Sequence, residues 1–265
     1  MVNVTPDSFS DGGNFLDAGR AVDLGLEMAR CGAEIIDIGG ESTRPGASPV
    51  AAEEELQRIA PVITGLRQKT DVLISVDTTK AEVARWALGN GVEIVNDVSA
   101  LTGDPDMAGL VAESGAGVVL MHMMGSPHTM QENPRYRDVV AEVHEFLERA
   151  VAAAEKAGVA PDSILVDPGL GFGKTVDHNL VLLNRLSVLS SLGKPILVGT
   201  SRKSFIGRLL DVPVEERLHG TSASVAAAIL RGAHVVRVHD VPQMTQVSRL
   251  IDAILNEAQT SGESE

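Results

Sequence analysis

The sequence contains very little cysteine and few aromatic residues. Its 265 residues include one cysteine, Cys31, so an internal disulfide and a zinc site built from several cysteines are excluded. Aromatic residues make up 3% of the chain, too few for a platform that stacks single-stranded nucleic acid. The first residues lack a signal-peptide pattern, and no apolar run approaches the roughly 20 residues of a membrane span. We therefore expect a cytoplasmic protein with no membrane partner.

Basic residues are also scarce. Lys and Arg together number 22 against 36 Asp and Glu, which gives a formal net charge of -14. Such a chain has no general basic surface for nucleic acid, so a site for an anion must be built from a few local cations. Hydrophobic residues make up 44% of the sequence, which is enough to form a sizeable core. These proportions favour a globular protein whose ligand is a small molecule.

What is present is a regular alternation of short apolar runs with stretches long enough for helices. The runs are nearly all apolar, which is typical of parallel strands covered on both faces. They span residues 1–4, 34–39, 72–77, 93–98, 117–122, 164–167, 195–199 and 235–239. Between them, Ala51–Gln68 begins with a glutamate-rich first turn and Ala18–Arg30 ends before Gly32, as surface helices do.

Eight strands that alternate with helices in about 250 residues predict an α/β protein with a closed (β/α)8 TIM barrel. An open doubly wound sheet is the alternative arrangement of the same elements. We expect a single domain over residues 1–259, followed by a polar, disordered tail at residues 260–265. Only Met1 and Val2 precede Asn3, so the first strand is expected to be incomplete.

Polar residues stand at the carboxyl end of every predicted strand. In a TIM barrel the loops that follow the strands build the active site, so we expect these residues to converge on one mouth. They are Asn3, Glu41–Arg44, Asp77, Asn96, Asp97, His122, Asp167, Ser201–Lys203 and Arg237–Asp240. Strand ends also become polar simply because they meet solvent, but this explanation is weaker when all eight ends are polar.

Cations gather at these positions although the chain is acidic. They are Arg44, Arg202, Lys203, Arg237 and His239. Guanidinium and ammonium groups suit phosphate oxygens, so the pattern predicts a ligand with a phosphate or diphosphate group. Pairing of each cation with a neighbouring Asp or Glu is the alternative.

Three polar residues lie inside or just past apolar runs, namely Asp77, Asn96 and Asp167. A buried carboxylate or amide without a partner would cost several kcal/mol, so each residue needs a polar partner. A heterocycle with adjacent ring N–H and amino donors would satisfy such a carboxylate through two hydrogen bonds. Hydrogen bonds to a neighbouring loop backbone are the alternative.

The segment Asp167–Thr175 resembles a phosphate-binding P-loop at first sight. The glycine that must open that motif falls on Pro168, which has no backbone N–H for a phosphate. Gly169, Gly171 and Gly173 are spaced two apart and do not fit a dinucleotide fingerprint either. We expect these glycines to keep the backbone close to a flat ligand instead.

Two longer motifs, Asn3–Gly13 and Gly39–Gly46, together closely resemble those of the dihydropteroate synthases. The similarity continues in order along the whole chain, through residues 74–78, 96–97, 121–123, 167–173, 201–204 and 237–240. The resemblance implies a pterin-binding barrel. It also implies a transferase that joins 4-aminobenzoate to (7,8-dihydropterin-6-yl)methyl diphosphate, releasing dihydropteroate and pyrophosphate for folate synthesis.

The same resemblance implies roles for individual residues. Residues expected to hold the pterin ring are Asp77, Asn96, Asp167 and Lys203. Residues expected to hold the diphosphate are Arg237, His239 and, through a Mg²⁺ ion, Asn3. Residues expected to form the 4-aminobenzoate site are Phe9, Thr43, Arg44, Pro45, Phe172 and Ser204. A homodimer and competition by sulfonamides in the aminobenzoate pocket are further expectations of the family.

The mechanism implied by the family is dissociative: pyrophosphate leaves first, and the arylamine attacks the cationic pterin methylene. Such a route needs cations near the leaving group and carboxylates near the pterin. The residues expected to be catalytic are Asp11, Thr43, Arg44, Lys203 and Arg237. Two alternatives are a pterin-binding paralogue without synthase activity and a pterin-dependent methyltransferase domain, neither of which needs this diphosphate grip.

Overall fold

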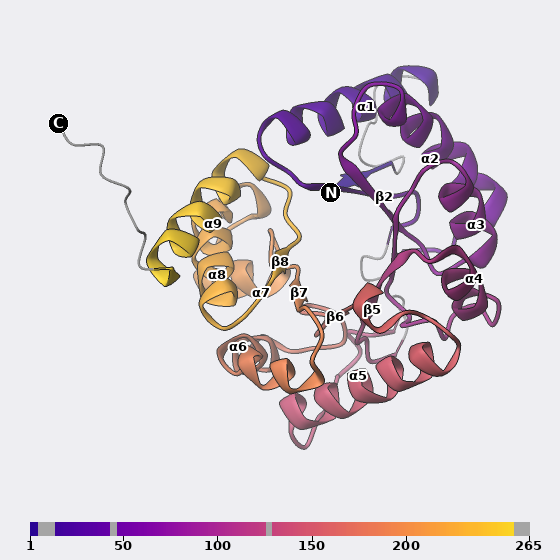
Figure 1. Ribbon diagram of the computed structural model, residues 1–265. Coiled ribbons are helices and arrows are strands. Elements are labelled where there is room, and N and C mark those ends of the chain that lie inside the picture. The colour runs from indigo at the N-terminus through magenta and orange to yellow at the C-terminus, as the bar shows by residue number, and fades with distance from the viewer. Residues whose placement is uncertain (5–13, 43–46, 126–128, 257–265) are drawn as a thin grey trace.

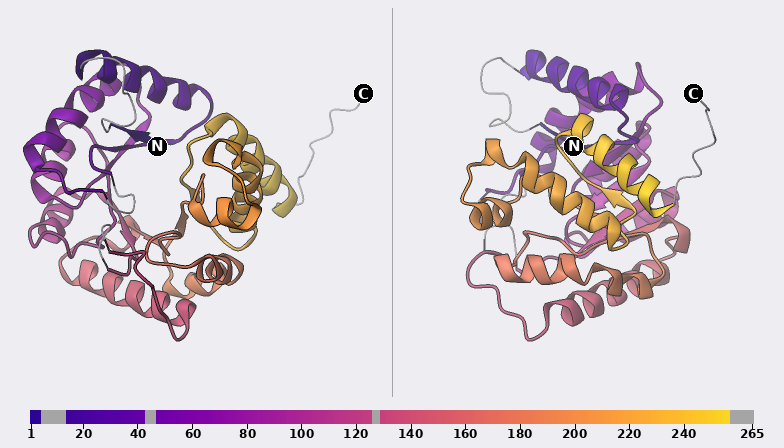
Figure 2. Two further views of the ribbon diagram at one scale, coloured as in Figure 1. Left: turned by 180° about the vertical axis from the view of Figure 1, so that it is seen from behind. Right: turned by 90° about the vertical axis from the view of Figure 1, so that its left-hand side faces the viewer.

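The computed structural model describes residues 1–4, 14–42, 47–125 and 129–256 and has the predicted (β/α)8 barrel architecture. Strands form a central ring and helices form an outer layer around it (Figure 1). The view from behind shows the same ring, with the helices outside it all the way round (Figure 2). In this part of the chain, no helix has both the length and the apolar character needed to cross a membrane.

The described residues contain eight parallel strands, each within the range predicted from the sequence. They are β1 (Val2–Asn3), β2 (Ile35–Gly39), β3 (Leu73–Asp77), β4 (Ile94–Asp97), β5 (Gly117–Met121), β6 (Ile164–Asp167), β7 (Leu197–Val198) and β8 (Val235–Val236). The first six form one sheet in sequence order, and β7 pairs with β8. A bridge between Val166 and Ile196 connects the two sheets. Next to β8, the Met1 amino group donates to the Val238 carbonyl at 3.0 Å.

Helices follow the strands along the chain. They are α1 (Asn14–Arg30), α2 (Ala52–Arg67), α3 (Ala81–Gly89), α4 (Met107–Ser114), α5 (Val139–Lys156), α6 (Val176–Asn184), α7 (Ser204–Leu210), α8 (Leu218–Leu230) and α9 (Val241–Leu255). Shorter 3-10 helices are η2 (Pro161–Ser163), η3 (Leu186–Leu192) and η4 (Val214–Glu216). The connection between β7 and β8 contains both α7 and α8. The predicted tail at residues 260–265 lies outside the described residues.

Alternation along the strands separates the core from the barrel interior. On β2, Ile36 and Ile38 are fully buried and belong to one apolar cluster with Ile59 and Ile63 of α2. Successive strand residues point to opposite faces, so Asp37 between the two isoleucines points away from α2 and into the barrel. The same alternation on β3 directs Asp77 inward. Polar side chains are thereby collected inside the ring, although the strands are almost entirely apolar.

Candidate active site

Arg237, which directly follows β8, connects two carboxylates from the other side of the ring. Its Nε donates to Asp37 Oδ2 at 2.6 Å, and its Nη2 donates to Asp77 Oδ2 at 2.6 Å. Asp37 lies on β2 and Asp77 is the last residue of β3. β2 and β3 are neighbouring strands early in the chain, and β8 is the last strand. This contact therefore links the first and last parts of the barrel inside its mouth.

Asp37 is a site residue that the sequence analysis missed. It stands two residues before the end of β2, whereas the polar residues considered lay at or near the ends of the apolar runs. The available signal was a charged residue in the middle of the apolar strand Ile35–Gly39. Its Oδ1 atom is buried and has no hydrogen-bond partner among the described residues. A buried acceptor of this kind is suited to an N–H donor of a bound ligand.

Burial strongly affects the charges of this cluster. It raises the pKa of Asp77 to about 7, although the guanidinium of Arg237 acts in the opposite direction. Burial also acts to lower the pKa of Arg237, but the carboxylates of Asp37 and Asp77 outweigh it and raise that pKa. Arg237 is therefore permanently charged, and Asp77 is the group of this pair whose charge changes near neutral pH.

Asn96 and Asp167 extend the polar lining of the barrel to β4 and β6. Asn96 is the register partner of Asp77, so their side chains lie on the same face of the sheet. Asp167 ends β6, and its Oδ1 accepts a hydrogen bond from the Gly169 backbone at 2.7 Å. Burial raises the pKa of Asp167, while this backbone N–H and then the charge of Lys203 lower it. Each of the two buried aspartates has a polar partner: Arg237 for Asp77 and, for Asp167, the neighbouring loop backbone that the sequence analysis gave as the alternative.

Lys203 brings a cation to the same interior from the loop after β7. Its Nζ lies 4.1 Å from the centre of the Phe172 ring, within the range of a cation–π interaction. Burial, followed by repulsion from Arg237, lowers the pKa of Lys203 to about 8. Ser204, the first residue of α7, is next to it in the chain. Lys203 and Phe172 therefore stand together, as expected for residues that face one site.

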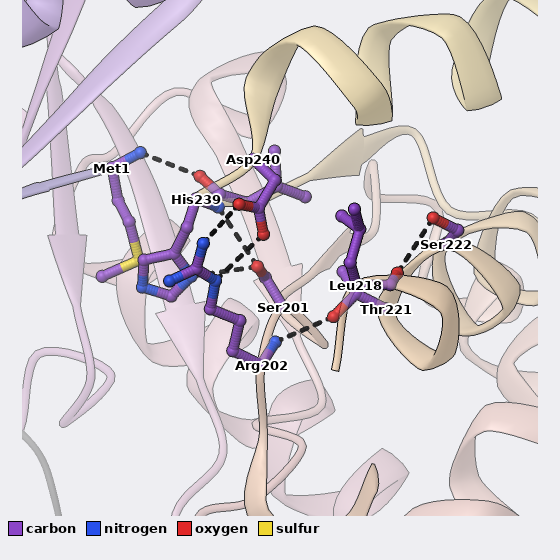
Figure 3. Close-up of polar contacts among 9 residues, drawn as sticks. Met1, Ser201, Arg202, Leu218, Thr221, Ser222, His239 and Asp240 are labelled. Carbon is purple, nitrogen blue, oxygen red and sulfur yellow. Dashed lines mark hydrogen bonds and ion pairs between the residues drawn. The ribbon is translucent and has the colours of Figure 1, made fainter. Parts of the chain in front are cut away.

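His239 and Arg202 at the rim differ from what the sequence analysis assumed (Figure 3). Arg202 was counted among the cations for an anionic ligand, but its guanidinium forms an ion pair with Asp240, with Nε 3.0 Å from Oδ2. His239 was also counted as a cation. Burial and nearby positive charges lower its pKa to about 4, so it is neutral at pH 7, and its Nδ1 lies 2.9 Å from Ser201 Oγ.

Asn3 lies at the carboxyl end of β1, where its register partner is Gly39 of β2. Its side-chain amide offers an oxygen, a ligand type that Mg²⁺ prefers. Within the described parts of the chain, no group of three or more His, Cys, Asp or Glu side chains is arranged to hold a metal ion.

Five predicted residues lie outside the described residues: Phe9, Asp11, Thr43, Arg44 and Pro45. The segment before residue 43 is firmly held. Glu41 forms an ion pair with Lys80, whose Nζ also lies 2.6 Å from a carboxylate oxygen of the fully buried Glu55. Arg58 donates to the carbonyl of Gly40 at 2.7 Å. Lys80 and Glu55 were not identified from the sequence, because neither lies at a strand end.

Comparison with known proteins gives a consistent result. The family model described as "Pterin binding enzyme" matches residues 1–239. A Synechocystis protein named dihydropteroate synthase is 49% identical over 255 residues, which are 96% of this chain and 88% of the relative. This agreement covers all the strands and the described mouth residues.

Solved structures agree as well. A Clostridium difficile dihydropteroate synthase crystallised in the presence of pteroic acid is 45% identical, with a TM-score of 0.90 over 96% of this chain and 94% of that chain. A Xanthomonas albilineans dihydropteroate synthase with 4-aminobenzoic acid is 47% identical, with a TM-score of 0.90 over 96% of this chain and 91% of that chain.

Proposed function

This chain belongs to the pterin-binding enzyme family, as one of its dihydropteroate synthases, and we propose how its barrel mouth binds and joins the two substrates. As a transferase of folate biosynthesis, it condenses 4-aminobenzoate with (7,8-dihydropterin-6-yl)methyl diphosphate. The products are 7,8-dihydropteroate and pyrophosphate. A paralogue without synthase activity and a methyltransferase domain are not favoured, because the relatives and structures compared are named dihydropteroate synthases.

We assign the pterin ring to the barrel interior, between Asp77, Asn96, Asp167 and Lys203. The observation that carries this assignment is the convergence of buried carboxylates, one of which keeps an acceptor atom without a partner in the described structure. A pterin offers ring N–H and amino donors side by side, which match a carboxylate, and a carbonyl that matches an ammonium. The buried amide of Asn96 supplies both a donor and an acceptor.

We assign the diphosphate to the rim, where Arg237 and the neutral His239 donate hydrogen bonds to its oxygens. The amide oxygen of Asn3 fits Mg²⁺, which would be held between this residue and the diphosphate and would neutralise leaving-group charge. Arg237 must move part of its hydrogen bonding from Asp77 to the diphosphate. The pterin makes this exchange possible by donating hydrogen bonds to Asp77, so that the carboxylate is not left unpaired when Arg237 turns to the diphosphate.

We assign the 4-aminobenzoate site to residues that follow four strands: Phe9 after β1, Thr43, Arg44 and Pro45 after β2, Phe172 after β6 and Ser204 after β7. Phe172 is buried beside Lys203, so it lies between the proposed pterin pocket and the outer part of the mouth. An aromatic ring stacks well against such a side chain. Residues 9 and 43–45 enter this proposal through the family resemblance alone.

The proposed mechanism is dissociative. Arg237 stabilises the diphosphate as its bond to the pterin methylene breaks, and the carboxylates of Asp167 and Asp11 tolerate the positive charge on the pterin. Lys203 holds the pterin, while Thr43 and Arg44 orient the arylamine that then attacks the methylene carbon. The amine loses its proton after attack, so the step leaves dihydropteroate, pyrophosphate and one proton.

A direct assay tests this function. The purified chain with both substrates and Mg²⁺ should form dihydropteroate and release pyrophosphate in equal amounts. Asp77→Asn should reduce the rate strongly, since an amide cannot accept two hydrogen bonds from adjacent donors. The matched control is Asp162→Asn in η2, an exposed aspartate away from the mouth. No product from a folded sample of the unmodified chain would overturn the proposal.

We further propose a cytoplasmic homodimer whose protomers each form one domain over residues 1–259, with residues 260–265 as a tail. The free Cys31 suits a reducing compartment. Exposed leucines favour contact through the helices of the last third of the chain: Leu209 of α7 is 56% exposed, Leu230 of α8 51% and Leu250 of α9 62%. Analytical ultracentrifugation should show twice the protomer mass, and a monomer at all concentrations would refute the dimer.

A further inference from the structure

Lys174 is almost completely buried, with 2% of its surface exposed, and it takes no part in the reaction proposed above. It lies in the loop that connects β6 with α6, close to Asp167 and Phe172 in the chain. The segment around it resembles a phosphate-binding loop only at first sight, because Pro168 replaces the glycine that the motif needs. The side chain instead turns inward, where its Nζ lies 2.9 Å from His122 Nδ1, 3.0 Å from the Phe172 carbonyl and 3.4 Å from the His122 carbonyl.

The three neighbours of Lys174 match its chemistry. An ammonium group has three N–H donors, and the two carbonyls and the imidazole nitrogen are three acceptors. Burial lowers the pKa of His122 to about 3, so its ring is neutral and Nδ1 is free to accept. When the ammonium of Lys174 donates to Nδ1, the imidazole proton is on Nε2. Lys174 therefore connects the segment after β5, through His122, with the loop after β6, through Phe172.

The two segments touch with no side chains between them. An added Cβ at Gly169 would lie 1.9 Å from the His122 carbonyl oxygen, and one at Gly173 would lie 2.6 Å from the Met124 carbonyl oxygen. Both glycines have positive φ, which a side chain would disfavour in any case. A loop packed this closely is stable in one position only if its buried backbone N–H and C=O groups have hydrogen-bond partners.

Side chains supply those partners for three consecutive carbonyls of the loop. Gln131 Nε2 donates to the carbonyl of residue 171 at 2.7 Å, and the Tyr136 hydroxyl donates to that of residue 173 at 2.8 Å. Lys174 donates to the carbonyl between them. Lys174 is the one donor of the three that can carry a charge, and it also donates to the His122 carbonyl in the segment after β5, the same segment that carries Gln131 and Tyr136.

We infer that Lys174 is a positioning residue of the synthase site: its buried ammonium fixes the loop that carries Asp167 and Phe172 and helps to keep the Asp167 carboxylate charged. This inference rests on the proposed function of that site. Lys174 acts on the substrates indirectly, through the position of this loop. The loop's other side meets Lys203, since an added Cβ at Gly171 would lie 3.1 Å from the Cδ of that lysine.

The electrostatic part of this role has a defined sign. Burial lowers the pKa of Lys174 to about 7 against the charge of Asp167 at the end of β6, and Lys203 before α7 lowers it further, while the neutral His122 is its contact after β5. Lys174 is therefore charged on the acid side of neutrality, where the acid limb lies. Lys203, Lys174 and Arg237 all lower the pKa of Asp167 against the effect of burial. Loss of the positive charge at residue 174 should therefore raise that pKa and move the acid limb of the activity profile to higher pH.

Lys174→Met tests the inference, with Lys194→Met as the matched control. Lys194 lies before β7 with a side chain 9% exposed, and it pairs with Glu155 and with the carbonyl of Pro161 in η2, away from the mouth. In Lys174→Met, amides of residues 169–175 should lose hydrogen-exchange protection, and kcat/KM should fall about 10- to 100-fold, as misplaced site residues cause. Its acid limb should also shift upward. Lys194→Met should change none of these.

Lys174→Gln separates the two parts of the role and serves if the methionine variant does not fold. An amide retains N–H donors without the charge, so loop protection should be largely kept while the acid limb still moves. Equal exchange in Lys174→Met and Lys194→Met, or an unmoved acid limb in both Lys174 variants, would overturn the inference. Lack of synthase activity in the unmodified chain would defeat the proposed function instead, and the exchange comparison alone would then decide the role of Lys174.

Discussion

Gly169 and His122 are so close that a side chain on residue 169 would overlap the carbonyl oxygen of residue 122. The two residues follow neighbouring strands, β6 and β5, and their contact sets the distance between two loops of the active-site mouth. Because Gly169 also has a φ of 65°, two separate penalties apply to any other residue there.

Substitution of this glycine separates the two penalties. Gly169→Ala should destabilise the protein by several kcal/mol more than Gly193→Ala, as urea unfolding would measure. Gly193 has a similar φ of 63° and open space around it, so alanine there should cost only about 1–2 kcal/mol for the left-handed backbone. Equal losses in the two variants would show that the loop moves aside easily and that close packing is not required.

Arg237→Ala should weaken binding of the diphosphate-bearing pterin far more than binding of pterin without the diphosphate. Each lost charged hydrogen bond is worth about 1.5–3 kcal/mol, so the diphosphate ligand should lose roughly 10- to 100-fold in affinity or more. Calorimetric titration with both ligands measures the difference. Arg149→Ala, which removes an exposed guanidinium of α5, is the control. The same loss for both ligands would refute the assignment of Arg237 to the diphosphate.

Magnesium should strengthen binding of the diphosphate substrate, and Asn3→Ala should reduce that gain. The reason is that an amide oxygen of the chain completes the oxygen ligands of the ion. Titration of the substrate with and without Mg²⁺ gives the effect, independently of turnover. Asn90→Ala, at the end of α3 and away from the mouth, controls for the loss of an asparagine. A magnesium effect unchanged in Asn3→Ala would exclude residue 3 as a ligand.

His122 should make the protein less stable in acid. Burial lowers its pKa from 6.5 to about 3, so the unfolded chain binds a proton in this range that the folded chain does not. The stability it contributes is complete above pH 6.5 and is lost as the pH falls toward about 3. His122→Gln should therefore remove a slope of about 1.4 kcal/mol per pH unit from unfolding free energies measured at pH 4–6. His144→Gln is the control, at a half-buried histidine of α5 whose Nε2 lies 2.8 Å from Ser191 Oγ, and an unchanged slope in His122→Gln would contradict the prediction.

Most of the barrel could be predicted from the sequence for a simple reason. Parallel strands covered on both faces are apolar runs, and a chain of eight such runs with polar ends has few ways to fold. Asp77, Asn96 and Asp167 were found because each ends an apolar run or interrupts one near its end. The proposed site was thus located by the boundaries of strands, which local sequence defines well.

What the sequence could not supply depends on contacts between distant segments. Asp37 stands out in the sequence as a charge within an apolar strand, but its partner Arg237 lies 200 residues later in the chain and only the folded chain brings the two together. Arg202 was expected to bind an anion. It pairs with Asp240 instead, in a turn where Arg202 has a φ of 56°, and the sequence does not reveal this backbone geometry. Lys174 has the sequence context of an exposed loop, and only the folded chain shows that its side chain turns inward.

The pairing of Arg237 with Asp37 and Asp77 also matters for inhibitor design. A compound that offers paired donors to these carboxylates enters a pocket where the protein already holds a competing guanidinium of its own. Its apparent affinity is lowered by the free energy needed to displace that guanidinium. An acidic substituent on the compound would pair with the displaced arginine and offset this free energy. Pterin mimics with an anionic arm should therefore bind more tightly than neutral ones of equal size.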